Sequence, residues 1–293
     1  MKNAHRTFVL TLLVISFFGA CKRTQVDPTG IPDTPDSLLP SRDDVLALGN
    51  PTNASTDPSS ERNYLMKKSS LVLSYNKSTG TPNWVAWHLS KAWKGHHLLN
   101  GTLAADPALP SGWPSVLPTD YTNNGFERLM LCPPSDRDSL AADLAPTYLM
   151  TNVLPAAPAV VRGPWAGFEN YCRKLLNDGY ELYIYAGGSG QGGTGDQGTA
   201  QSIAKGKIAV PQALWKVVLV LPVGTQDLKR VSAAARTIAV WIPNNNASGN
   251  TSWTNFRTSV DQIESRTSTD FFSAVPVDIQ RIIEASADVI TVN

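Results

Sequence analysis

The sequence predicts an α+β fold, with a mixed, mainly antiparallel central sheet and flanking helices. Three observations support this class. Short runs rich in β-branched and aromatic residues, bounded by turn residues, occur in both halves of the chain. One run, residues 215–221, is almost entirely apolar, which is typical of a central strand covered on both faces. Helical patterns are few and do not alternate strictly with the strands, as they would in a parallel α/β fold.

The first strands are predicted at residues 71–75 and 84–89. Both runs are rich in Val, Leu, Tyr and Trp, and the segment 80–83, Gly-Thr-Pro-Asn, is typical of a hairpin connection. A proline-rich loop is expected after them, and residues 138–150 are expected to hold a short helix or a loop.

The clearest helix is predicted at residues 164–176. Pro164 occupies its first turn, where the missing N–H costs no hydrogen bond, and Gly179 lies just past its end. Further strands are predicted at residues 181–186, 207–210, 215–221 and 237–242, and further helical segments at 259–264 and 277–287.

The N-terminal residues are predicted to be a targeting segment rather than part of the fold. A basic start precedes an apolar run at residues 8–18 that is too short to span a bilayer. Residues 18–21, Phe-Gly-Ala-Cys, are similar to a bacterial lipobox, so residues 1–20 are predicted to be a lipoprotein signal peptide and Cys21 to carry lipid. A plain secretory leader is the alternative, but it does not explain the cysteine.

The mature protein is therefore expected in the bacterial cell envelope, lipid-anchored, periplasmic or at the cell surface. Residues 21–62 are rich in Pro, Asp, Ser and Thr and show no apolar period apart from a brief turn at residues 44–48, which predicts a flexible tether. The folded domain is predicted to cover residues 63–293.

The overall charge gives no indication of a nucleic-acid partner. The 293 residues carry a formal net charge of +1 and 42% hydrophobic side chains, which is ordinary for a globular protein. Binding to a polyanion would therefore need a local basic patch.

The three cysteines leave two alternatives open. If Cys21 carries lipid, Cys132 and Cys172 remain, and an oxidising compartment would permit a disulfide between them. Two buried free thiols are the equally weighted alternative.

The most informative stretch is residues 125–137, Gly-Phe-Glu-Arg-Leu-Met-Leu-Cys-Pro-Pro-Ser-Asp-Arg. It resembles the signature of the DNA/RNA non-specific endonucleases, the ββα-metal or His-Me finger nucleases, whose core reads Asp-Arg-Gly-His and precedes an Asp-Arg pair. Similar segments follow in the family's order from about residue 70 to 288, among them 150–152, 163–166 and 239–244. The resemblance implies a ββα-metal core, a Mg²⁺ cofactor and DNA or RNA as the partner.

The implied chemistry is hydrolysis of a phosphodiester bond. A bound Mg²⁺ neutralises developing charge, a base activates water, and arginines stabilise the transition-state oxygens. In the family, the signature histidine is the base and an asparagine near the start of the long helix binds the metal. A glutamate further along that helix holds metal-bound water.

The resemblance assigns five residues of this chain to that site. Arg128 is the first arginine of the signature, and Glu127 stands at its aspartate position. Glu169 and Arg173 match the helix glutamate and arginine, and a spacing of four places them on one helix face. Asn152 matches the asparagine before the helix loop, and with Glu169, which acts through water, it is assigned to the metal.

Two positions lack the chemistry that the site requires. Met130 stands at the general-base position, and a thioether cannot take a proton from water. Val161 stands at the metal-asparagine position, and valine has no donor atom for a cation that prefers oxygen. An arginine expected just before the pair Asp106-Pro107 is also missing. Because a positioned base contributes about 10²–10⁴-fold, poor cleavage is expected.

The sequence therefore predicts a catalytically impaired lipoprotein of this family that retains nucleic-acid binding. The expected basic patch comprises Arg128, Arg137, Arg162, Arg173 and Lys174. One alternative is an active Mg²⁺-dependent endonuclease with a rearranged site. Another is a structural envelope protein.

The retained residues also have ordinary interpretations. Glu169 and Arg173 fit a surface pair one helical turn apart. Asn152 fits a turn residue, and Arg128 fits an ion-pair partner of Glu127 or of Asp136.

Three histidines bear on the missing base. His96 and His97 are adjacent candidates to replace it, but neighbouring strand residues face opposite ways and loop histidines are commonly surface residues. His88 lies in an aromatic-rich strand and is expected to be structural.

Overall fold

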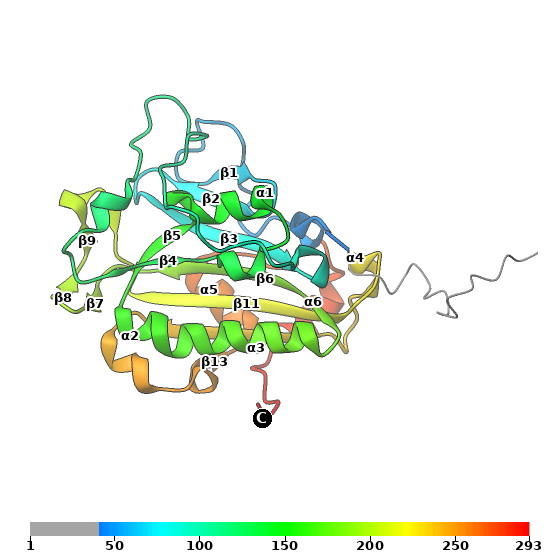
Figure 1. Cartoon of the computed structure of the whole chain (residues 1–293). Helices are drawn as coiled ribbons and strands as arrows, with labels where there is room; N and C mark the ends of the chain where they lie inside the picture. The colour runs from blue at the N-terminus through cyan, green and yellow to red at the C-terminus, as the bar shows by residue number, and fades with distance from the viewer. Residues whose placement is uncertain (1–40, 293) are drawn as a thin grey trace, which may run out of the picture. The chain divides into compact units, whose positions relative to one another are not determined.

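The computed structural model describes residues 41–292, and a seven-stranded sheet lies at its centre (Figure 1). The strand order is β1-β2-β3-β6-β11-β12-β13, and every neighbouring pair is antiparallel. The strands are β1 (Tyr64–Lys67), β2 (Val72–Asn76), β3 (Thr81–Leu89), β6 (Tyr180–Ser189), β11 (Ala213–Pro222), β12 (Arg236–Pro243) and β13 (Arg257–Thr258). The predicted α+β class with a mainly antiparallel sheet is confirmed.

Three two-stranded ribbons and six α-helices complete the described chain. The ribbons pair β4 (Glu127–Met130) with β5 (Val153–Ala156), β7 (Gly193–Gly195) with β8 (Gly198–Ala200), and β9 (Ser202–Ile203) with β10 (Ile208–Ala209). The helices are α1 (Ala141–Leu144), α2 (Pro158–Val160), α3 (Ala166–Asn177), α4 (Asp227–Arg230), α5 (Val260–Thr267) and α6 (Val277–Ile283). None of the described helices combines the length and apolar character needed to cross a bilayer.

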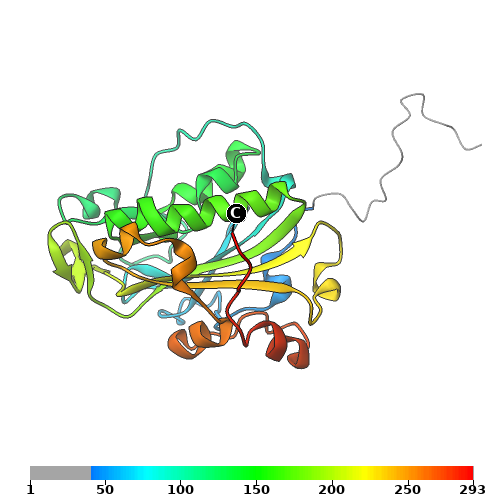
Figure 2. The same ribbon diagram turned by 90° about the horizontal axis from the view of Figure 1, so that it is seen from below.

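The apolar run predicted to be a central strand is β11, which lies between β6 and β12. Its side chains alternate between two cores because successive residues of a strand face opposite sides of the sheet. Leu214, Val218 and Val220 belong to one core cluster, and Trp215, Val217, Leu219 and Leu221 to the other. Helix α3 covers the first face, and α5 and α6 cover the second (Figure 2).

Helix α3 is the helix predicted from Pro164 and Gly179. It presents its apolar stripe to the sheet, where Phe168 and Cys172 are buried. After its last residue, Asn177, Gly179 takes a positive φ of 95°, a conformation that glycine adopts without strain.

The predicted flexible tether is wrong for its second half. Residues 45–48 form a 3-10 turn, and Val45 and Leu48 are buried in the core cluster beneath α5 and α6. The backbone of Ser55 bridges to Tyr64 of β1. The ordered chain thus begins before the predicted boundary at residue 63. The predicted signal peptide, Cys21 and the first half of the tether lie outside the described residues.

Candidate functional site

The signature lies on β4, at the wall of an open cleft with a volume of about 690 Å³. Because side chains alternate along a strand, Leu129 is buried in the core, whereas the exposed Arg128 and the half-buried Met130 line the cleft. Three aromatic residues also line it: Tyr121, Phe126 and Tyr148. The expectation that the signature lies on a strand is confirmed.

Met130 occupies the part of the cleft wall where the family resemblance expects a base. Its side chain packs against the apolar cluster that contains Tyr121. Of the described residues that line the cleft, none is a histidine, and the exposed His96 and His97 are not among them. The described cleft wall therefore offers no imidazole in place of the lost base.

Glu127, at the start of β4, forms an ion pair with Arg162. Strand β4 pairs with β5, and Arg162 lies in the turn between α2 and α3, so this contact joins the first strand of the hairpin to the turn that precedes α3. The Arg162 side chain is 75% exposed, so the pair contributes at most about 1 kcal/mol. The main consequence of this pair is that the carboxylate of Glu127 offsets the positive charge of Arg162, which was predicted to attract nucleic acid.

Val161 begins a π-helical turn, Val161–Trp165, that leads into α3. Its half-buried side chain packs against the core and supplies methyl groups but no oxygen. The turn lies close to a neighbouring loop: a Cβ on Gly163 would stand 2.1 Å from the carbonyl oxygen of Gly249. The position matched to the metal-binding asparagine is therefore in a closely packed apolar turn.

Asn152 is not placed to bind a metal, contrary to the assignment from the sequence. Its buried side chain accepts a hydrogen bond from the backbone N–H of Cys132 at 3.0 Å. The same amide donates to the carbonyl oxygens of Cys132 and Thr147, at 2.9 Å each. Because both ends of the amide are occupied, Asn152 ties the end of β4 to the turn before β5.

Glu169 points from α3 toward the sheet and meets a partner that the sequence did not predict. Its Oε1 accepts a hydrogen bond from Trp165 Nε1 at 2.8 Å and lies 3.4 Å from Nζ of Lys216 on β11. Lys216 is 1% exposed, and its ammonium lies 4.2 Å from the Trp165 ring centroid. Burial raises the pKa of the Glu169 carboxyl, and the Lys216 charge opposes that rise. The sequence signal for this partner is a single lysine inside an apolar strand.

Arg173 shares a helix face with Glu169, as predicted, with charged atoms 3.9 Å apart. Its guanidinium turns toward the segment after β4, where Nη1 lies 3.2 Å from Asp136 Oδ1 and 3.1 Å from Ser135 Oγ. Asp136 is buried and also accepts a hydrogen bond from Trp87 Nε1. Arg173 therefore joins α3 to the end of the signature and does not present a free cation.

Arg137 cannot contact nucleic acid, contrary to the prediction. Its side chain is fully buried, and the guanidinium lies over the Trp93 ring, 4.5 Å from the centroid. It donates hydrogen bonds of 2.7–2.9 Å to the carbonyl oxygens of Ser70, His88 and Asp136. Its role is to hold backbone segments together.

The basic patch is smaller than predicted. Lys174 is exposed but lies 3.2 Å from Asp178, one turn along α3. Arg128 is exposed beside the cleft, with a long 3.4 Å hydrogen bond to the carbonyl of Pro118 and no ion pair within residues 41–292. Of the predicted patch, Arg128 is the cation that remains available at the cleft.

Known proteins share both the sequence pattern and the fold. A family model described as DNA/RNA non-specific endonuclease matches residues 48–278. The chain belongs to this family. A nuclease from Nostoc sp. (strain PCC 7120) is 41% identical over 251 residues, covering 86% of this chain and 88% of that protein. A nuclease from Serratia marcescens is 27% identical over 258 residues, covering 84% and 87%.

A solved structure agrees with this assignment at the level of the fold. A chain of the EndoG/EndoGI complex matches with a TM-score of 0.64 and 18% identity, covering 79% of this chain and 91% of that chain. The ββα unit expected of a DNA/RNA non-specific endonuclease corresponds here to β4, β5 and α3.

The DNA/RNA non-specific endonucleases are metal-dependent, usually with Mg²⁺. The described residues do not fit such an ion at the position that the family resemblance indicates. Val161 has no donor atom, the amide of Asn152 is bound to backbone, and Glu169 is bound to Lys216. Two groups of three or more His, Asp or Glu side chains in the described chain lie close enough to share a cation, and neither includes a signature residue.

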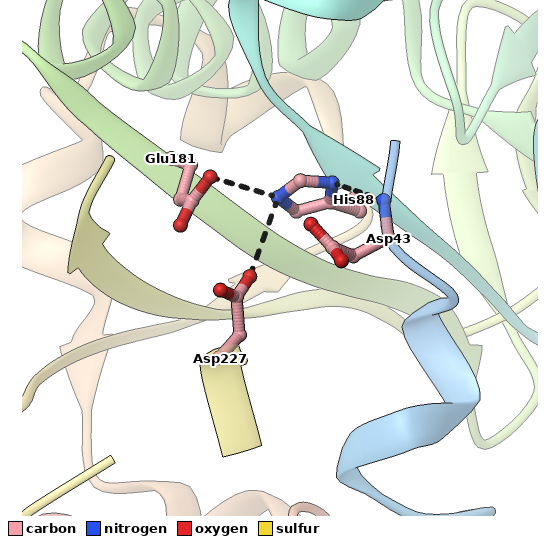
Figure 3. A group of neighbouring side chains, drawn as sticks. All are labelled: Asp43, His88, Glu181 and Asp227. Atoms are coloured by element: carbon pink, nitrogen blue, oxygen red, sulfur yellow. Dashed lines mark hydrogen bonds and ion pairs between the residues drawn. The ribbon is translucent and has the colours of Figure 1, made fainter. Parts of the chain in front are cut away.

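One of these groups surrounds the buried His88 of β3 and includes Asp43 from the N-terminal segment (Figure 3). The backbone N–H of Asp43 donates to Nδ1 of His88 at 3.3 Å, which places the ring proton on Nε2. That nitrogen faces Glu181 at 3.6 Å and Asp227 at 4.0 Å. Arg230 pairs with both carboxylates and supplies their counter-charge. The expectation of a structural histidine agrees with this network, and a protonated Nε2 is not a metal ligand.

Cys132 and Cys172 are free, buried thiols in the structure, not a disulfide. Burial raises the pKa of both thiols to about 12. Because the thiolate is the reactive form, neither cysteine is a candidate nucleophile.

Proposed function

We propose that this protein is a lipid-anchored member of the family that binds nucleic acid and cleaves it poorly or not at all. The observation that carries the proposal is Met130, which stands on the wall of the signature cleft where the family resemblance expects a base. A positioned general base contributes about 10²–10⁴-fold to rate. The apolar turn at Val161 removes a metal ligand as well, and groups that act as one unit do not compensate for each other.

The test is a digestion assay with purified protein. Plasmid DNA and RNA are incubated with Mg²⁺ or Mn²⁺, with chelator as the control. We expect no chelator-sensitive degradation above background. Robust degradation that chelator stops would overturn the proposed impairment.

Nucleic-acid binding is expected to be weak and sensitive to salt, because Arg128 is the cation of the predicted patch that remains available at the cleft and Arg162 is paired with Glu127. Each phosphate contact lowers the slope of log K against log salt by about 0.9, so we expect a slope near −1 in gel shifts with duplex DNA. Arg128→Ala should make this slope shallower by about one.

Lys174→Ala is the matched control, since that side chain already pairs with Asp178 away from the cleft lining. It should leave the salt slope almost unchanged. An absence of binding at low salt, or an equal loss in both variants, would contradict a nucleic-acid site at this cleft.

An active endonuclease with a rearranged site is the second candidate, favoured by the shared helix face of Glu169 and Arg173. The digestion assay decides between it and the impaired protein. Glu169→Gln is the suitable variant for a positive result, because it keeps an acceptor for Trp165, which Glu169→Ala would not.

Anchoring through Cys21 in the bacterial cell envelope is part of the proposal and rests on the sequence around that residue. Labelling of the chain by a radioactive fatty acid, lost in Cys21→Ala, would support it. A protein that neither binds nor cuts nucleic acid would leave the structural envelope role.

A further inference from the structure

A group of carboxylates lies where α5 meets the end of α6, on the face of the sheet opposite α3 (Figure 2). Asp261 and Glu264 come from α5, and Glu284 follows the last residue of α6. One oxygen from each of the three lies within 4.8 Å of the others. The backbone N–H of Asp261 donates to the carbonyl oxygen of Glu284 at 3.2 Å, which fixes the two helices against each other.

No basic side chain neutralises this group in the part of the chain that the structure describes. None of the ion pairs within residues 41–292 involves Asp261, Glu264, Glu284 or the nearby Asp270. Burial, followed by repulsion from the other carboxylates, raises the pKa of Glu264 to about 7 and that of Glu284 to about 8. The network around His88 differs in this respect, because Arg230 lies within it.

One oxygen in the group lacks any partner. Glu284 is 4% exposed, and its Oε1 has no hydrogen bond in the described structure. Glu264 differs, since its Oε1 accepts the backbone N–H of Phe271 at 2.6 Å. A buried carboxylate oxygen without a donor is costly, and a cation would satisfy it.

We propose that Asp261, Glu264 and Glu284 form a binding site for a divalent cation of the size of Ca²⁺. Hard cations take oxygen ligands, and Ca²⁺–oxygen distances of about 2.3–2.6 Å place opposed ligands about 5 Å apart. All three oxygens lie within 4.8 Å of one another, which is within the span that the ligands of one Ca²⁺ ion cover. Asp261 is exposed, so the ion can enter from solvent and water can complete its coordination.

The site is distinct from the nuclease signature, because none of its three carboxylates belongs to residues 125–137.

Calcium titration of the chelator-stripped full-length protein tests the proposal. Isothermal titration calorimetry at pH 8.5 should show one Ca²⁺ per chain, and Glu284→Gln should weaken binding by at least about 10-fold. Thermal melting at pH 8.5 should show a rise in melting temperature with Ca²⁺ over chelator in the wild type and a smaller rise in Glu284→Gln.

Two further variants keep the test decisive. Asp261→Asn changes an exposed ligand with little risk to folding and should also weaken Ca²⁺ binding by about 10-fold. Asp278→Asn changes an exposed aspartate of α6 outside the group and should bind as the wild type does. No Ca²⁺ binding at pH 8.5, or unchanged binding in both ligand variants, would overturn the site.

Discussion

Replacing Met130 by histidine and Val161 by asparagine in the same chain is expected to produce Mg²⁺-dependent cleavage of DNA and RNA. The histidine would return a base to the cleft wall, and the asparagine would return an oxygen ligand near the start of α3. We expect a gain of at least about 10²-fold over the wild type, the lower end of what a positioned base contributes. Plasmid nicking with Mg²⁺, compared with chelator, measures it.

Each single variant is expected to remain near the wild-type rate, because a base without a metal, or a metal without a base, does not complete the unit. The cleavage rate of the double variant should also stay below that of a family member whose site is complete. The position before Asp106 still lacks the family's arginine, and Asp106 itself is buried against Lys68. Cleavage by the Met130→His single variant would contradict the inference that the base at 130 and the metal ligand at 161 must both be restored. A double variant that folds with the wild-type melting temperature but does not cut would contradict the assignment of Val161.

Replacing Arg137 by alanine is expected to lower the free energy of unfolding by about 3–5 kcal/mol. Its guanidinium is fully buried, and its loss leaves three carbonyl oxygens without their donor and Trp93 without its packing partner. Urea denaturation measures the change. Arg137→Lys should recover little, because an ammonium does not reproduce the planar geometry of three directed donors.

Arg128→Ala is the matched control on the same segment. Its side chain is exposed, so the free energy of unfolding should change by less than about 0.5 kcal/mol. The two substitutions should therefore have different effects. Arg128→Ala should weaken nucleic-acid binding and leave stability unchanged, whereas Arg137→Ala should lower stability. If both substitutions lowered the free energy of unfolding equally, the burial of Arg137 would not account for its contribution to stability.

Much of the fold followed from local patterns in the sequence. The apolar run at β11 and the Pro164 and Gly179 signals around α3 each correspond to an element at nearly the predicted bounds. These patterns reflect which side chains must leave water and where a helix can start or stop, and both are properties of short segments. The start of the domain was harder to predict. Val45 and Leu48 are two residues, which is too few to show a hydrophobic period, and they are buried by helices that are distant in the sequence.

The site was only partly predictable. The sequence placed Met130, Arg128 and the pair Glu169–Arg173 correctly on their elements. It could not show that Arg137 and Asn152 turn inward, because burial of a polar side chain depends on backbone groups far away in the chain. The contact of Lys216 was missed for the same reason, since its partner Glu169 lies on a helix that is distant in sequence and packs against that face of the sheet.

The early start of the ordered chain limits how far the proposed lipid anchor lets the domain travel. Nineteen residues lie between Cys21 and Ser41, the first described residue, and a chain of that length spans at most about 70 Å. A tether that ran to residue 62 would have allowed roughly twice that reach. If Cys21 is acylated, the contact of Asp43 with His88 therefore holds that end of the fold within about 70 Å of the acylated cysteine.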